Sequence, residues 1–399
     1  MESPDILSRM PSKRPAWIAI ACVLWGGVLL ALLLRAGLHP HRLSSLTTYL
    51  AGGARWSASQ PLYTNWRGFI YPPVIAWVFS LLDHMPLAAA AVLWRFLTAG
   101  TFLFGLWALL RSGVFHRIPA GYRGIVFLAV LPLSIGNLDN AQANPLIAGL
   151  MMMAVAALQW QAWSLCALAI ALATTFKIYP LALGLLFCVL RPRELSWRIA
   201  LMLLGLGLLP FALQDSHYIA GQYHAWFQSR LADDRFHYPM KDAPLDLWYL
   251  LVRLGNLPIS ERAYTAAQVI AGCGLAAFVY HQVRRGAALR DILADLFLLV
   301  SVWMLLLGPA TENQTYVVLA PAACLFGVRT LNGSYPVFIR VLALSAFTLL
   351  LAAVARNSLL PALKSPLYMA VQPVGALVLL AAVLGDLQQR PVTAPASPQ

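Results

Sequence analysis

Long apolar stretches dominate this chain and restrict what it can fold into. Residues 17–34, 86–110 and 367–387 each provide about the 20 apolar residues that a helix needs to cross the hydrocarbon core of a bilayer. The chain is 60% hydrophobic and 11% charged, whereas about a quarter of the residues in a typical soluble domain are charged. Strands of a membrane β-barrel would alternate apolar and polar residues, and these stretches do not. The sequence therefore predicts an all-α, polytopic membrane protein.

The net charge of +13 comes mainly from basic residues in short gaps beside the apolar stretches. Lys13 and Arg14 precede the first stretch, and Arg191 and Arg193 follow another. This clustering is typical of the cytoplasmic loops of membrane proteins and argues against a nucleic-acid partner. We expect a multi-pass protein of the cell inner membrane with both termini in the cytoplasm. The first stretch has no Ala-x-Ala cleavage pattern and is expected to remain as an anchor.

About twelve transmembrane helices follow from this charge pattern. The pair 164–176 and 180–190 is short and could instead be one helix kinked at Tyr179-Pro180, but two helices keep every arginine-rich gap on one side. The predicted spans are 16–34, 86–110, 121–136, 143–158, 164–176, 180–190, 199–213, 262–282, 291–307, 315–328, 337–354 and 367–387. They form a single transmembrane domain over 1–390, with long extracytoplasmic loops at 35–85 and 214–261 and a disordered Pro/Ala/Ser tail at 391–399.

The first long loop contains two further helix candidates. Residues 74–82 form an apolar stretch about half the length of a span, directly after Tyr71-Pro72-Pro73. Residues 46–56 combine apolar and small residues with one arginine. Proline is tolerated in the first turn of a helix, and short apolar helices can lie on the membrane surface. Both segments are therefore predicted to be interfacial or re-entrant helices.

Lys177 is the most informative single residue because it stands between two apolar segments. A lysine at the centre of a bilayer costs about 2.5–3.5 kcal/mol on insertion scales, so it needs an anionic partner or a route to water. At the outer ends of two short helices it would suit a lipid phosphate or diphosphate. Snorkelling to the headgroups, or pairing with a buried acid, is the alternative explanation.

Polar side chains also gather in three predicted extracytoplasmic segments. The turn 136–144 is dense in hydrogen-bonding groups, which suits sugar hydroxyls, although the same groups could cap the following helix. Glu312 follows Gly308-Pro309, which should end a helix, and it is either functional or a capping acid. The loop around 230–241 could bind phosphate and sugar or be a solvated, salt-bridged surface. The candidate substrate-binding residues in these segments are Asn140, Gln142, Asn144, Asn313, Asp233, Asp234 and Arg235.

Common enzyme motifs are missing from the sequence. The five cysteines stand singly, without the spacing of a zinc or disulfide site. Residues 272–277 match a dinucleotide-binding spacing but lie in an apolar helix with no preceding strand. P-loop, HExxH and GxSxG motifs are absent, so ATPase, zincin and serine-hydrolase functions have no support. The absence of Asp-x-Asp argues against a metal-held nucleotide-sugar donor without excluding it, and no residue is assigned as a metal or cofactor ligand.

Five segments in order along the chain carry a family resemblance: AGGARWSASQPLY (51–63), FIYPPV (69–74), NAQANPLI (140–147), FKIYPL (176–181) and LGPATENQTYVVLAP (307–321). Together they resemble glycosyltransferase family 87, polyprenyl-phosphate-mannose-dependent mannosyltransferases of the GT-C class. The resemblance implies a GT-C-like bundle in which the first extracytoplasmic loop and neighbouring helix ends form the active site. It also implies transfer of mannose or another hexose from a polyprenyl-phosphate donor to a lipid, glycan or protein acceptor. Tyr71, in the second segment, is a further substrate-binding candidate.

The chain departs from that family at one position of consequence. Family members carry a catalytic aspartate early in the first loop, whereas Ser44–Tyr49 contains no acid, and neither does the whole stretch 35–82. An acceptor hydroxyl needs a carboxylate base, and the best replacements by topology are Glu312 and Asp139, with Glu312 slightly ahead. Asp233 and Asp234 stand behind them.

Two other classes of function stay open at this point. A lipid or solute transporter or flippase would also be helical, would also bury Lys177 and would tolerate the missing acid, and inverted repeats would favour it. A catalytically silent subunit of an envelope-assembly complex is the other alternative.

Overall fold

A computed structural model describes residues 17–64, 68–308, 311–359 and 365–390 of the chain. Within these residues the regular secondary structure is helical, which confirms the all-α prediction. The chain divides into two compact units. Unit 1 contains residues 1–25, 106–136 and 236–399, and unit 2 contains residues 26–105 and 137–235.

Unit 2 is built from the first half of the chain and carries the first long loop. The chain order of helices explains most of its packing, since α6 lies on α7, α7 on α8 and α9, and α10 on α9. Its helices are most of α1 (Trp17–Leu38) and α4 (Leu87–Arg111), together with α2 (Ser45–Ser57), α3 (Pro73–Asp83), α6 (Asn144–Gln159), α7 (Trp163–Phe176), α8 (Pro180–Leu190), α9 (Pro192–Leu213) and α10 (Ser216–Leu231).

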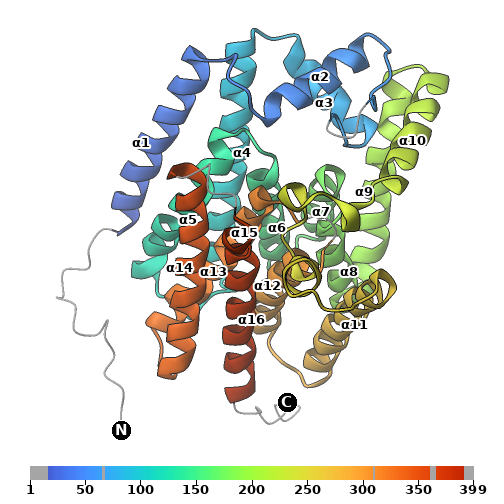
Figure 1. The fold of residues 1–399 in the computed structure, drawn as a ribbon. Coiled ribbons are helices and arrows are strands. Elements are labelled where there is room, and N and C mark those ends of the chain that lie inside the picture. Colours follow the sequence, from blue (N-terminus) through green and yellow to red (C-terminus); the bar gives the residue numbers. More distant parts are fainter. Residues whose placement is uncertain (1–16, 65–67, 309–310, 360–364, 391–399) are drawn as a thin grey trace. The chain divides into compact units, whose positions relative to one another are not determined.

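The two helices predicted in the first loop are present and pack on each other (Figure 1). Helix α3 begins at Pro73, where the missing N–H of proline is harmless. Gly53 of α2 lies directly against the backbone of Phe79 and Ser80, and a methyl group at Gly53 would overlap those atoms. The glycine therefore permits the close approach of α2 to α3.

The short pair of apolar helices folds as two helices and not as one kinked helix. Helix α7 ends at Phe176, Lys177 is extended (φ −149°, ψ 141°), and α8 begins at Pro180. Gly184 of α8 lies against the side chain of Ile170 of α7, so the two helices pack side by side. Since 170 and 184 are each seven residues from 177, the chain reverses at the lysine.

Unit 1 contains the second half of the chain and part of the first. Helix α14 packs on α13 and α16, and α12 packs on α11 and α16. Its helices are most of α5 (Arg123–Asp139), together with α11 (Glu261–Arg284), α12 (Leu289–Leu306), α13 (Ala320–Leu331), α14 (Val337–Leu359), α15 (Pro366–Met369) and α16 (Val371–Gln389), with the short segments η1 (Ala120–Tyr122), most of η2 (Arg235–His237), η3 (Met240–Asp242), η4 (Tyr249–Leu254) and η5 (Asn313–Val318).

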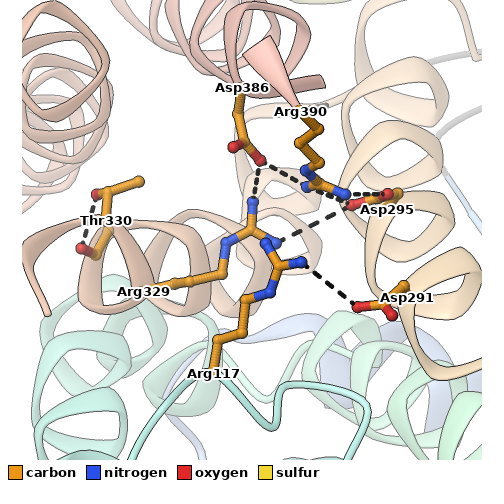
Figure 2. Close-up of polar contacts among 8 residues, drawn as sticks. Arg117, Asp291, Asp295, Arg329, Thr330, Asp386 and Arg390 are labelled. Atoms are coloured by element: carbon orange, nitrogen blue, oxygen red, sulfur yellow. Dashed lines mark hydrogen bonds and ion pairs between the residues drawn. The ribbon is translucent and has the colours of Figure 1, made fainter. Parts of the chain in front are cut away.

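A buried ion-pair network joins three helices of unit 1 (Figure 2). Arg329 of α13 donates to Asp386 of α16 at 2.5 Å and lies 4.0 Å from Asp295 of α12. Arg390 follows α16 and donates to Asp295 at 2.6 and 2.8 Å and to Asp386 at 2.6 Å. Two arginines therefore balance two aspartates in a region where unpaired charges are costly.

The helix predictions agree with the structure except in detail. In the described residues each of the twelve predicted spans coincides with one or two helical segments, but α5 continues three residues further than predicted, to Asp139. Among the described residues, eight helices are long and apolar enough to cross a membrane by length and composition, so a count of twelve spans is not confirmed. Helix α10 in the second long loop was not predicted. The predicted disordered tail lies outside the described residues, and the single-domain prediction stays a prediction.

Candidate functional site in the first-loop unit

An aromatic cluster in unit 2 joins the first loop to the helix bundle. Tyr49 of α2 lies 4.7 Å from Phe79 of α3 and 5.8 Å from Trp94 of α4, measured between ring centroids. Trp94 in turn stacks on Phe176 at 6.1 Å, at the end of α7. Tyr71 completes the cluster at 5.3 Å from Tyr49. These rings fix α2, α3, α4 and α7 in one arrangement, because aromatic pairs contribute energy beyond their buried area.

The polar turn after α5 is held by the same cluster. Trp94 Nε1 donates to the carbonyl oxygen of Ala141 at 2.9 Å, and the Ala143 amide donates to the Tyr49 hydroxyl at 3.3 Å. The Ser45 amide donates to the Asn140 carbonyl at 3.0 Å, and Asn140 Nδ2 lies 3.4 Å from Ser45 Oγ. The predicted sugar-binding turn therefore contacts the beginning of α2, the stretch in which the family acid is missing.

Asp139 is the acid that adjoins that stretch. Its carboxylate accepts from Arg42 Nη1 at 2.8 and 2.9 Å and from Arg35 Nη1 at 3.3 Å. Arg95 Nη2 donates to its carbonyl oxygen at 2.8 Å. An acid in the last turn of a helix is opposed by the helix dipole, and the three arginines offset that cost.

The amide side chains of the turn differ in their surroundings. Gln142 is half-buried. Asn144 is fully buried at the first turn of α6, and neither its Nδ2 nor its Oδ1 has a hydrogen-bond partner in the structure. Asn137 is 6% exposed, and its Oδ1 also lacks a partner. Buried amides without partners are uncommon in native proteins, so this turn has hydrogen-bonding capacity that its own fold does not use.

Tyr71 belongs to the aromatic cluster, and Lys177 adjoins the cluster in sequence. Lys177 directly follows Phe176, whose ring lies 6.5 Å from that of Tyr71. Lys177 is half-buried, and Tyr71 is 8% exposed with its hydroxyl 3.3 Å from that of Tyr49. Unit 2 therefore brings Lys177, Tyr71, Asp139, Asn140, Gln142 and Asn144 to helix ends and turns that are joined by shared contacts.

The charged loop after α10 is mutually neutralised in part. Asp233 accepts from Arg230 at 3.0 Å and from Arg235 at 2.8 Å, and its side chain is 11% exposed. Asp234 is exposed. This geometry agrees with the salt-bridged alternative.

Glu312 and Asn313 lie in unit 1. Glu312 caps η5, since its side chain accepts from the Thr315 amide while its own amide donates to Thr315 Oγ1 at 3.2 Å. The Asn313 carbonyl accepts from Gln372 Nε2 at 3.2 Å. The capping role explains the position of Glu312 at the start of η5. Its side chain remains exposed to solvent while it caps.

Asp246 is a buried acid that was not among the site residues predicted from the sequence. Asp246 is 5% exposed, and its Oδ1 accepts from the Tyr249 amide at 3.0 Å. Burial raises the pKa of Asp246 to about 7, against the opposing effect of that hydrogen bond. The signal available in the sequence was a carboxylate with leucine on both sides, at Leu245-Asp246-Leu247.

Metal ligands do not assemble in the described part of the chain. Among residues 17–64, 68–308, 311–359 and 365–390, no three His, Cys, Asp or Glu side chains lie close enough together to hold a metal ion. The chemistry available there consists of carboxylates, amides and cationic side chains.

The solved structures that resemble this chain include two crystal structures of ArnT from Cupriavidus metallidurans, one bound to undecaprenyl phosphate and one in the apo state. Each is 15% identical to this chain with a TM-score of 0.38. The matches cover 91% and 92% of this chain and 76% and 77% of the ArnT chains. No curated protein matches the sequence.

The sequence pattern of one protein family matches more than half of the chain. The matched residues are 69–309, which include the FIYPPV, NAQANPLI and FKIYPL segments and begin after Ser44–Tyr49. This match extends over helices of both units, from α3 to α12. The chain therefore belongs to glycosyltransferase family 87.

Proposed function

We propose that this protein is a membrane glycosyltransferase that moves a sugar, mannose or another hexose, from a polyprenyl-phosphate donor to an acceptor at the extracytoplasmic face of the cell inner membrane. The acceptor is a hydroxyl of a lipid, a glycan or a protein. Membership of family 87 supports sugar transfer. The lipid-linked donor and a site formed by the first loop are supported by one observation in unit 2. The first-loop helices, the turn 137–144 and the chain reversal at Lys177 are joined by one aromatic cluster.

The proposed reaction is a direct displacement at the anomeric carbon. The acceptor oxygen forms a bond to that carbon while the bond from carbon to the phosphate oxygen breaks. A carboxylate takes the hydroxyl proton, and the phosphate leaves on the lipid with the bonding electron pair. Such a step needs a base for the hydroxyl and cationic stabilisation for the departing phosphate.

We assign the base to Asp139 ahead of Glu312. The turn that carries Asp139 is hydrogen-bonded to Ser45, within the stretch where family members have their aspartate. Glu312 belongs to the other unit and already caps η5. Lys177 is proposed to contact the donor phosphate. The amides of Asn140, Gln142 and Asn144 are proposed to bind sugar hydroxyls.

Transfer from radiolabelled polyprenyl-phosphate sugars by the purified protein in liposomes tests the proposal. We expect Asp139→Asn to lower turnover by roughly 10²–10⁴-fold, the range found for loss of a general base, with donor binding measured separately. Lys177→Ala should weaken donor binding and leave the melting temperature nearly unchanged. Asp291→Asn is the matched control, because Asp291 is a half-buried acid paired with Arg117 at 3.8 Å in unit 1.

The alternatives make different predictions for the same preparation. Absence of turnover with every donor, together with movement of lipid across the bilayer, would replace the enzyme with a flippase. If Asp139→Asn retains turnover and Glu312→Gln loses it, the base is Glu312. If both retain turnover, Asp233 and Asp234 become the next pair to change.

A further inference from the structure

A cavity of about 570 Å³ lies at the carboxyl end of α1. It is lined by Arg35, Leu38, His39, Pro40, His41 and Arg42, so four of its six residues carry guanidinium or imidazole groups. Pockets that hold small ligands are typically about 300–1,000 Å³. The cavity is therefore large enough for a phosphate together with part of an attached group.

A turn after α1 brings the two arginines together. The His39 amide donates to the Arg35 carbonyl at 2.9 Å, and the Arg42 amide donates to the His39 carbonyl at 3.2 Å. Arg42 therefore returns beside Arg35, and both guanidinium groups reach the carboxylate of Asp139. Ion pairing to one shared acid holds both cations in position.

The charges at the cavity do not balance. Asp139 is one negative charge against Arg35 and Arg42, and Arg95 brings a third guanidinium to its backbone carbonyl. Arginine stays protonated at any pH that a protein experiences, so an excess positive charge persists there. The side chains of Arg35 and Arg42 are also 51% and 47% exposed, which leaves donors available beyond those that Asp139 occupies.

The surface beside the cavity is apolar. Leu34 is 55% exposed, Leu38 73% and Leu43 86%. Helix α1 is among the helices apolar enough to cross a membrane, and these leucines extend its exposed apolar surface to the cavity. A ligand that fits both features carries an anionic head on an apolar tail.

We propose that this cavity binds the phosphate at the head of a membrane lipid. Guanidinium groups bind phosphate through two parallel N–H···O bonds, and the half-exposed Arg35 and Arg42 provide such donors. The imidazoles of His39 and His41 add further hydrogen-bond donors. Two lipids offer this chemistry, namely a polyprenyl phosphate and an anionic glycerophospholipid. The assignment to a polyprenyl phosphate rests on the proposed function, whereas recognition of a lipid phosphate does not.

A simpler explanation of the arginines accounts for only part of the geometry. A cation in the last turn of a helix stabilises the helix dipole, and Arg35 fits that role. It does not explain why Arg42 and Arg95 also converge on Asp139, or why four basic residues line one open pocket. A surface ion pair needs one cation for one carboxylate.

Binding measurements on the full-length protein in zwitterionic phosphatidylcholine nanodiscs test the proposal. The probes are a polyprenyl phosphate without sugar, phosphatidylglycerol and inorganic phosphate, with dissociation constants from microscale thermophoresis. The test variant is Arg35→Gln/Arg42→Gln, and Arg35→Lys/Arg42→Lys retains the charge without the paired donors. Arg117→Gln is the matched control, because Arg117 is 43% exposed and paired with an acid in unit 1.

We expect at least one lipid phosphate to bind at least tenfold more tightly than inorganic phosphate, and Arg35→Gln/Arg42→Gln to weaken that binding by roughly tenfold or more. The lysine variant should recover part of the loss, and Arg117→Gln should leave the dissociation constant within about twofold. In Arg35→Gln/Arg42→Gln the Asp139 carboxylate loses both arginine partners, which could disturb the fold. Adding Asp139→Asn removes that unpaired charge. An equal loss of lipid binding in the triple variant would therefore show that the arginines recognise phosphate and that misfolding is not the cause.

Other results would overturn the proposal. These are unchanged lipid binding in the glutamine variant, an equal loss in Arg117→Gln, or inorganic phosphate binding as tightly as both lipids. The radiolabel transfer assay is independent of these measurements. Phosphate-lipid binding by a protein that transfers no sugar would reject the proposed function and keep the cavity. Normal sugar transfer by the wild-type protein, together with lipid binding that does not depend on Arg35 and Arg42, would keep the proposed function and reject the lipid-phosphate site in the cavity.

Discussion

Replacing Arg329 by methionine tests whether the buried ion-pair network holds unit 1 together. The Arg329 side chain is 3% exposed, and its partners Asp295 and Asp386 are 4% and 6% exposed (Figure 2). Methionine is close to arginine in length and keeps apolar contacts, so the substitution removes mainly the charge and the donors. The two aspartates would then share Arg390 alone.

The expected cost follows from that imbalance. Removing one partner of a buried ion pair costs about 3–5 kcal/mol, because the surviving charge keeps its desolvation penalty. Arg390 still reaches both acids at 2.6 Å, so we expect the lower end of the range, about 3 kcal/mol. Replacing both partners in Arg329→Met/Asp386→Leu leaves Arg390 paired with Asp295 through two bonds. The double variant should therefore be more stable than the single one.

The free energy of unfolding is measured by denaturant titration of the purified protein in detergent. Arg117→Met is the matched control, since Arg117 and Asp291 are 43% and 32% exposed at 3.8 Å and such pairs contribute about 0–1 kcal/mol. The reasoning is refuted if Arg329→Met costs no more than Arg117→Met. A double variant less stable than Arg329→Met would show that the Arg390–Asp386 pair stabilises unit 1 by more than the unbalanced acid costs.

Three further predictions address other parts of the chain. Burial raises the pKa of Asp246 to about 7, so the folded state holds a proton that the unfolded state releases near pH 4. The free energy of unfolding should therefore fall as pH rises from about 4 to 7. Asp246→Asn should flatten that slope in denaturant titrations at several pH values. Gly53→Ala should cost about 1–3 kcal/mol by pushing α2 from α3, whereas Gly26→Ala, which meets no atom within 4 Å, should be nearly neutral in thermal unfolding. In a cysteine-free background, a single cysteine replacing His237 should react with an impermeant thiol reagent outside intact cells and one replacing Glu194 should not; the opposite pattern would invert the predicted topology.

The helices were predictable because their signals are local. Apolar stretches and prolines at helix starts placed α2 and α3 within a residue or two of their observed bounds. The break at Lys177 was also predictable, since Pro180 cannot continue a helix and the lysine cannot remain in an apolar one. Helix α10 was missed because its sequence is polar and carries no periodic apolar signal; its start is marked only by Asp215, whose side chain accepts from the Tyr218 amide.

The sequence was sufficient to predict which residues form the candidate site, but not which residues they contact. The turn 137–144 was identified from its density of amides. Its contacts could not be, because Ala143 and Tyr49 are separated by 94 positions in the chain, and Ala141 and Trp94 by 47 positions. The sequence placed Glu312 slightly ahead of Asp139, although both are acids at helix ends and no partner of either could be read from it. Their partners differ, with two arginines on Asp139 and a capping threonine on Glu312.

What the sequence by itself determined is the class of molecule. Stretches of apolar residues long enough to span a bilayer allow only helices, since every backbone polar group must be satisfied within the segment. The order of five short segments along the chain also carried the resemblance to family 87 that the match over 69–309 bears out. Tertiary structure alone decided which charges meet. Arg35 and Asp139 are 104 residues apart, and Arg329 and Asp386 are 57 apart. The strength of a charge pair depends on distance and burial, and both arise only when the helices pack.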